Sequence, residues 1–128
     1  MEHPHESLVR RFFAEFGNQA TVSELFTHDA VWLEPGASPI SGRYQGPAAI
    51  AALIRTVIES SDHTFHIVEL EDVVVGPRHG MALVRVAGEH GGRSIVTTDT
   101  VILTFQDGRI AQFRVVSEDQ REVDEFWA

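Results

Sequence analysis

The sequence predicts an α+β fold in which a cone-shaped, curved antiparallel β-sheet packs on three helices of the N-terminal half and encloses a pocket. Apolar residues recur at helical spacing in separate segments of residues 6–60. Residues 64–116 instead form long β-prone stretches separated by turn residues. The 128 residues, 43% of them hydrophobic, suffice for one core, so we expect one domain over residues 1–128.

Three helices are expected in the first half. The first runs from Glu6 to Phe16, where five apolar residues fall on one face. The second covers Thr21–Phe26, because Thr21-Val22-Ser23-Glu24 has the capping-box pattern of a hydroxyl and a carboxylate that satisfy each other's free amides. The third has the most complete apolar face, at positions i, i+3, i+4, i+7 and i+8; it opens at Gly46-Pro47 and ends at residues 60–62.

The strands follow from β-propensity and turn chemistry. Ala30–Glu34 is predicted as a strand that Pro35-Gly36 stops, and the connector 38–46 has room for a short strand at Arg43-Tyr44. Tight hairpins at Gly91-Gly92 and Asp107-Gly108 favour an antiparallel meander, and a final short helix is expected over Asp119–Trp127. The meander strands are expected at Thr64–Val75, Met81–Glu89, Ser94–Phe105 and Ile110–Val116. Incomplete helical cover of such a sheet leaves an apolar pocket.

Composition argues against several classes of partner. The net charge is −9 and the chain has no lysine, which disfavours nucleic acids and anionic membranes. The lack of cysteine excludes disulfides and favours a cytoplasmic setting. The N-terminus lacks a signal-peptide pattern, and no apolar run approaches the roughly 18 residues of a membrane helix. The seven histidines lack metal-ligand spacing and no phosphate loop occurs, so neither a metal nor another cofactor is expected.

Several segments resemble a known superfamily. Leu25-Phe26-Thr27-His28-Asp29-Ala30-Val31-Trp32-Leu33-Glu34-Pro35-Gly36 and Ser41-Gly42-Arg43-Tyr44-Gln45-Gly46-Pro47 are similar to the helix–strand–turn–helix region of ketosteroid isomerases and SnoaL-like proteins. Phe105-Gln106-Asp107-Gly108-Arg109-Ile110 resembles their hairpin, and the C-terminal residues resemble a SnoaL-like subgroup common in bacteria. The resemblance implies the nuclear transport factor 2-like fold, a small-molecule pocket and a homodimer formed through the sheet. It does not fix a reaction, because this fold hosts many.

Glu34 is the first candidate for catalysis. By resemblance to the isomerases it stands where their general-base Asp precedes a Pro. Trp32 lies two residues earlier, so a regular strand places both side chains on one face. A carboxylate against an indole in a dry pocket keeps its proton to higher pH, which suits proton transfer. The alternative is a solvated residue at the pocket rim.

Asp99 and Arg85 form the second candidate. Asp99 shares strand parity with Val101 and Leu103, and Arg85 shares it with Leu83, so both are expected to face inward. They could orient a water or a substrate group, or they could form a purely structural ion pair. The resemblance places the isomerases' second acid, which donates a hydrogen bond to the substrate oxyanion, near Val101. Valine cannot donate such a bond.

The pocket lining is expected from the inward faces of the predicted elements. Phe12 stands where the resemblance implies the isomerases' helix-one tyrosine, so both of their oxyanion donors are missing. His66 could serve as an inward proton shuttle, or it could face solvent while Phe65 and Ile67 pack inward. The predicted lining is Trp32, Phe12, Phe16, His66, Leu83, Val101, Leu103 and Phe113.

Two functional hypotheses are compatible with these residues. The first is a cofactor-free enzyme of isomerase, dehydratase, cyclase or hydrolase type acting on a small, apolar, oxygenated molecule, with Glu34 as the acid/base and Asp99 and Arg85 orienting a second group. The second is a non-catalytic ligand-binding or dimerisation module of the same fold, which the two missing donors favour.

Overall fold

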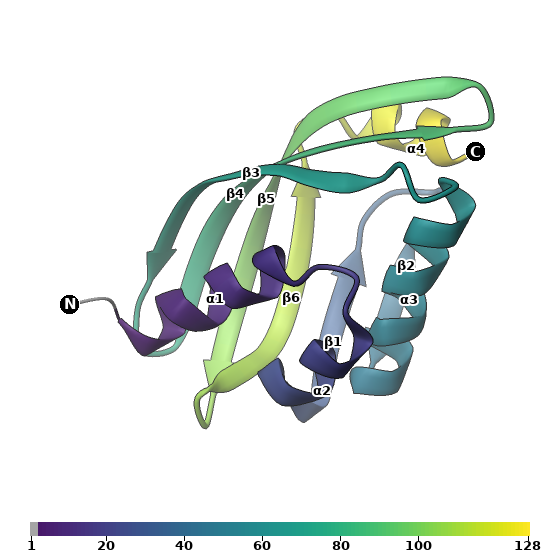
Figure 1. Ribbon diagram of the computed structural model, residues 1–128. Helices are drawn as coiled ribbons and strands as arrows, with labels where there is room; N and C mark the ends of the chain where they lie inside the picture. The colour runs from purple at the N-terminus through teal and green to yellow at the C-terminus, as the bar shows by residue number, and fades with distance from the viewer. Residues whose placement is uncertain (1–2) are drawn as a thin grey trace.

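A curved six-stranded sheet and four helices make up residues 3–128, which a computed structural model describes (Figure 1). The elements are α1 (Pro4–Ala14), α2 (Gln19–Leu25), β1 (Phe26–Glu34), β2 (Gly42–Gln45), α3 (Pro47–Ser60), β3 (His66–Val75), β4 (His79–His90), β5 (Arg93–Gln106), β6 (Arg109–Ser117) and α4 (Gln120–Trp127). None of these helices is long and apolar enough to cross a membrane.

The sheet has the strand order β2-β1-β6-β5-β4-β3. Strands β3 to β6 form the expected antiparallel meander, with hairpins at Gly91-Gly92 and Asp107-Gly108. β1 lies parallel to β6, with Trp32 opposite Phe113, and makes the sheet mixed. The predicted fold class is confirmed. The sequence did not predict the parallel pairing of β1 with β6. No hairpin joins the two strands, so no turn signal in the sequence gives their relative direction.

The start of α2 differs from the prediction. Its N-cap is Asn18, whose side chain accepts a hydrogen bond from the amide of Ala20. Thr21 therefore lies inside the helix, where its hydroxyl donates to Glu15 at 2.7 Å. Glu24 pairs with Arg11 of α1 instead of closing a capping box. The capping-box prediction was wrong because a better cap stands three residues earlier.

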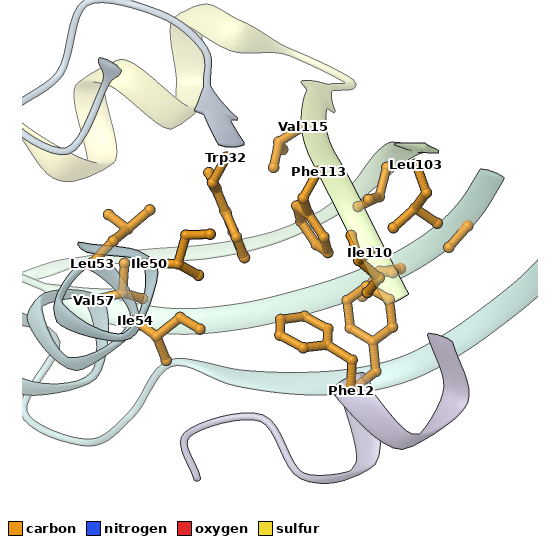
Figure 2. Close-up of a cluster of buried hydrophobic side chains, with 14 of the residues drawn as sticks. Phe12, Trp32, Ile50, Leu53, Ile54, Val57, Leu103, Ile110, Phe113 and Val115 are labelled. Carbon is orange, nitrogen blue, oxygen red and sulfur yellow. The ribbon is translucent and has the colours of Figure 1, made fainter. Parts of the chain in front are cut away.

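The helices lie on the concave face of the sheet and bury one aromatic-rich core (Figure 1). Phe12 of α1 lies at its centre, with ring contacts to Phe26, Trp32 and Phe113. Trp32 and Phe113 stack with their ring centroids 3.9 Å apart. Figure 2 shows this pair between the sheet and the apolar face of α3, formed by Ile50, Leu53, Ile54 and Val57. Both rings of the stacked pair belong to the core and also line the pocket described below.

The outer, convex face of the sheet carries a group of exposed large apolar side chains. Val74, Met81 and Ile102 are cross-strand neighbours, and each is at least 37% exposed. Leu83 and Val116 lie one pleat away, on either side of Thr100, and are both 40% exposed. Large apolar side chains in such a row are uncommon on a solvated sheet face.

Candidate functional site

One pocket opens between the concave face of the sheet, α3 and α4. Its cavity volume is about 70 Å³, which is room for roughly five water-sized groups. Nearly all of its lining is apolar or aromatic, and the exceptions are two carboxyls, Glu34 and Asp99, and two hydroxyls, Thr97 and Ser117. The other residues that line it are Phe13, Phe16, Trp32, Ile40, Leu53, Ile54, Val57, Phe65, Ile67, Val84, Val86, Ile95, Val101, Phe113, Val115, Val123 and Trp127.

Glu34 reaches the pocket from the last residue of β1. The regular strand alternation puts it on the same face as Trp32, whose indole nitrogen donates a hydrogen bond to Oε1 of Glu34 at 2.9 Å. Burial raises the pKa of Glu34 to about 7, the hydrogen bond from Trp32 opposes the rise, and the nearby charge of Asp99 adds to it. At neutral pH both the protonated and the ionised forms of Glu34 are therefore populated.

Asp99 reaches the same pocket from β5, on the other side of β6. Burial raises its pKa to about 6, and a hydrogen bond with the Ser117 side chain, directly across on β6, partly opposes the rise. Its Oδ1 atom is buried and has no hydrogen-bond partner among residues 3–128. Buried polar atoms are nearly always partnered, so this oxygen is a place where a ligand could bind.

Tyr44 of β2 lies beside the site, outside the pocket lining. It stands opposite Trp32 in the β1–β2 pair, and its hydroxyl donates to the carbonyl of Ile40 at 2.7 Å. Burial raises the pKa of Tyr44, and the charge of Glu34 contributes. Ile40 itself lines the pocket, so this hydrogen bond holds part of the wall in place.

The structure places the predicted site residues in three groups. Six of them line the one pocket and so lie together: Glu34, Asp99, Trp32, Phe16, Val101 and Phe113. Phe12 and Leu103 belong to the core behind the pocket and do not line it. His66 is exposed at the start of β3, where its Nδ1 atom contacts the carbonyl of Thr64, while Phe65 and Ile67 line the pocket.

The inward orientation predicted for Arg85 and Leu83 was wrong. Asp99 is in register with Val84, so Val84 shares its face and the flanking Leu83 and Arg85 point to the convex side, where both are exposed. Arg85 and Asp99 therefore lie on opposite faces of the sheet, and neither the structural ion pair nor the joint orienting role forms. The prediction from strand alternation was wrong because β4 carries apolar residues on both faces. The sequence pattern alone therefore does not show which face of β4 is buried.

Several pocket residues were not foreseen. Ser117 matters most, because it is the hydrogen-bonding neighbour of Asp99. Ser117 pairs with Asp99 because the β5–β6 register shifts between Thr104 and Phe105. A regular pairing counted from the Asp107-Gly108 turn would not have placed Ser117 opposite Asp99. Val123 and Trp127 of α4 close one end of the pocket, a role that no sequence pattern indicated. Within residues 3–128, no group of three His, Asp or Glu side chains is gathered to hold a metal ion.

Comparison with known proteins gives consistent matches over almost the whole chain. The model of the SnoaL-like domain family matches residues 9–113. Uncharacterized proteins of Mycobacterium tuberculosis and Mycobacterium bovis are 27% identical over 124 residues, which is 94% of this chain and 94% of theirs. The solved structure of Bal32a, from a soil-derived mobile gene cassette, is 30% identical with a TM-score of 0.92 and covers 98% of this chain and 97% of its own. TerC, co-crystallized with polyporic acid, has the same fold, with a TM-score of 0.83 at 14% identity over 97% and 98% of the two chains.

Proposed function

This chain belongs to the SnoaL-like family, and we propose that it is a cofactor-free enzyme that performs acid/base chemistry on a small, apolar, oxygenated molecule. The observation that supports the proposal best is Glu34, a carboxyl buried in an apolar pocket with a pKa of about 7. A group that is half protonated at neutral pH can both take and return a proton.

The chemistry that fits this pocket is proton transfer at a carbon next to a carbonyl. Ionised Glu34 takes the proton, the electrons of the broken C–H bond move toward the carbonyl oxygen, and protonated Glu34 returns the proton to the same or a neighbouring carbon. Trp32 holds Oε1 of Glu34, which leaves Oε2 for the substrate. Asp99, two strands away on the same concave face of the sheet, orients a second group of the substrate. Isomerisation, elimination and cyclisation all include this step. TerC, a protein of the same fold, was co-crystallized with polyporic acid.

Exchange of solvent deuterium tests the proposal on a panel of carbonyl compounds, so the natural substrate need not be identified first. The protein in D2O is given small ketones and aldehydes, and loss of the proton signal at the carbon next to the carbonyl is followed by NMR. We expect faster exchange for at least one compound and a loss of about 100-fold or more in Glu34→Gln. Glu59→Gln, an exposed acid on α3, is the matched control and should exchange like the wild type. Equal exchange by Glu34→Gln, or no exchange with any compound, would overturn the proposal.

A non-catalytic binding module is the second candidate. The small cavity favours it, because the stacked rings of Trp32 and Phe113 leave space for only a compact ligand. Under this alternative the protein binds a small molecule, detected as a rise in melting temperature, yet no compound of the panel exchanges deuterium.

We also propose that two copies of the chain associate through the convex face of the sheet. The exposed apolar side chains there lie in adjacent cross-strand rows, and burial against a second copy would remove them from water. Sedimentation should give a mass near twice the 14.2 kDa of one chain. A mass of one chain at micromolar concentration would contradict this association.

A further inference from the structure

The lining of the pocket is acidic and contains no cation. Glu34 and Asp99 are its only ionisable side chains among residues 3–128, and no Arg or His lines it. Arg85, the one cation that the sequence offered as a possible partner of Asp99, points to the opposite face of the sheet. The two carboxyls therefore repel each other without a neutralising partner, and this site repels anions and attracts cations.

Asp99 offers an acceptor that nothing in the described part of the protein uses. Its Oδ1 atom is buried and has no hydrogen-bond partner among residues 3–128. Ser117 and Thr97 are the hydroxyls of the lining, and Ser117 already bonds to the Asp99 side chain. A buried carboxylate oxygen without a donor is unfavourable, so the missing donor is best supplied by the ligand.

The walls around these carboxyls are aromatic. Six rings line the pocket: Phe13, Phe16, Trp32, Phe65, Phe113 and Trp127. The faces of aromatic rings carry partial negative charge and attract an ammonium group, and they also exclude the water that would otherwise weaken the attraction of the carboxyls.

We propose that the substrate group held by Asp99 is a protonated amine, so that the pocket takes small apolar amines and rejects carboxylates. The inference rests on the proposed function, because it names the second group that Asp99 orients while Glu34 exchanges a proton. An ammonium supplies the donor that Oδ1 lacks and neutralises the acidic pair, whereas a hydroxyl supplies only the donor. The cavity of about 70 Å³ has room for roughly five water-sized groups, so the buried part of the ligand is limited to about four or five non-hydrogen atoms.

Binding of an amine should depend on pH. A cation favours the ionised forms of Glu34 and Asp99, so the amine should bind more tightly as pH rises from 5 to 8. The other titratable groups around them are Tyr44 on β2 and Asp124 on α4, which accepts a hydrogen bond from the amide of Ala37. Arg43 on β2 donates to Gln45. None of the three supplies a competing cation to the pocket.

Three small probes of matched shape test the inference: isopropylamine, isopropanol and isobutyrate, each titrated into the protein at pH 8 by isothermal calorimetry. We expect the amine to bind about tenfold or more tighter than the alcohol, and the carboxylate not to bind. Asp99→Asn should lose that preference and keep its affinity for the alcohol, while Glu59→Gln should bind all three like the wild type. Amine affinity should fall as the pH is lowered to 5.

The wild-type titrations decide the inference even where Asp99→Asn fails to fold. Equal binding of amine and alcohol, preference for the carboxylate, or no binding of any probe would overturn it. Deuterium exchange separates this result from a failure of the proposed function. Exchange of uncharged ketones without amine preference refutes only the amine, and amine binding without exchange refutes only the chemistry.

Discussion

Replacing Glu34 with glutamine should stabilise the protein at high pH and leave its stability unchanged at low pH. The change removes a carboxyl whose pKa rises from 4.5 to about 7 on folding. Each unit of that rise corresponds to about 1.4 kcal/mol, so ionised Glu34 lowers the free energy of unfolding by about 3 kcal/mol above pH 7. Glutamine keeps an oxygen that can accept the hydrogen bond from Trp32.

The pH dependence comes from proton binding at Glu34. Between pH 4.5 and 7 the folded protein binds a proton at Glu34 that the unfolded chain has released, so wild-type stability falls as pH rises through this window. Glutamine carries no titrating proton and escapes this loss. The two proteins should be about equally stable at pH 4, and Glu34→Gln should be more stable by about 3 kcal/mol at pH 8.

Thermal unfolding from pH 4 to pH 8 measures the effect. For a domain of this size, about 3 kcal/mol raises the melting temperature by about 10 °C at pH 8. Glu59→Gln removes an exposed acid from α3 and should show no such pH-dependent difference. A difference between Glu34→Gln and the wild type that stays constant across this range would show that Glu34 is not desolvated, since a solvated rim carboxyl behaves that way.

Three other variants probe the site and the sheet. Asp99→Asn removes the charge that helps raise the pKa of Glu34. In the same unfolding series, the loss of stability with rising pH should therefore end at a lower pH than in the wild type. Phe113→Ala removes a buried ring that stacks on Trp32, and urea unfolding should show a loss of about 3–5 kcal/mol; a loss below about 1 kcal/mol would contradict the packing. Leu83→Glu places a charge on the convex face and should shift sedimentation toward a single chain without changing deuterium exchange; an unchanged mass would count against that interface.

Turn chemistry and helical spacing carried most of the fold prediction. Asp107-Gly108 and Gly91-Gly92 are used as hairpins, and the apolar face of α3 is buried as its spacing required. These features are local, so the sequence contains them. The parallel pairing of β1 with β6 joins segments that are distant along the chain, such as Trp32 and Phe113, and no local pattern encodes it.

The candidate site was predictable only in part, for the same reason. Trp32 and Glu34 share a strand whose two faces differ, so their common orientation followed from alternation. Arg85 lies on β4, where large hydrophobic residues occur on the convex face as well as on the concave face. The alternation of residues along β4 therefore does not show which face is buried. Ser117 reaches Asp99 through a register shift in β5–β6 that only the three-dimensional structure reveals.

A 13C NMR titration of the Glu34 and Asp99 side-chain carboxyls in the ligand-free protein tests most directly whether Glu34 is poised for proton transfer. Spectra of Glu34→Gln and Asp99→Asn assign the two signals. We expect the pair to titrate with apparent pKa values of about 7 and about 6, and removal of Asp99 to lower the pKa of Glu34. Titration of both carboxyls near pH 4, as in water, would contradict this expectation and leave Glu34 without its proposed role.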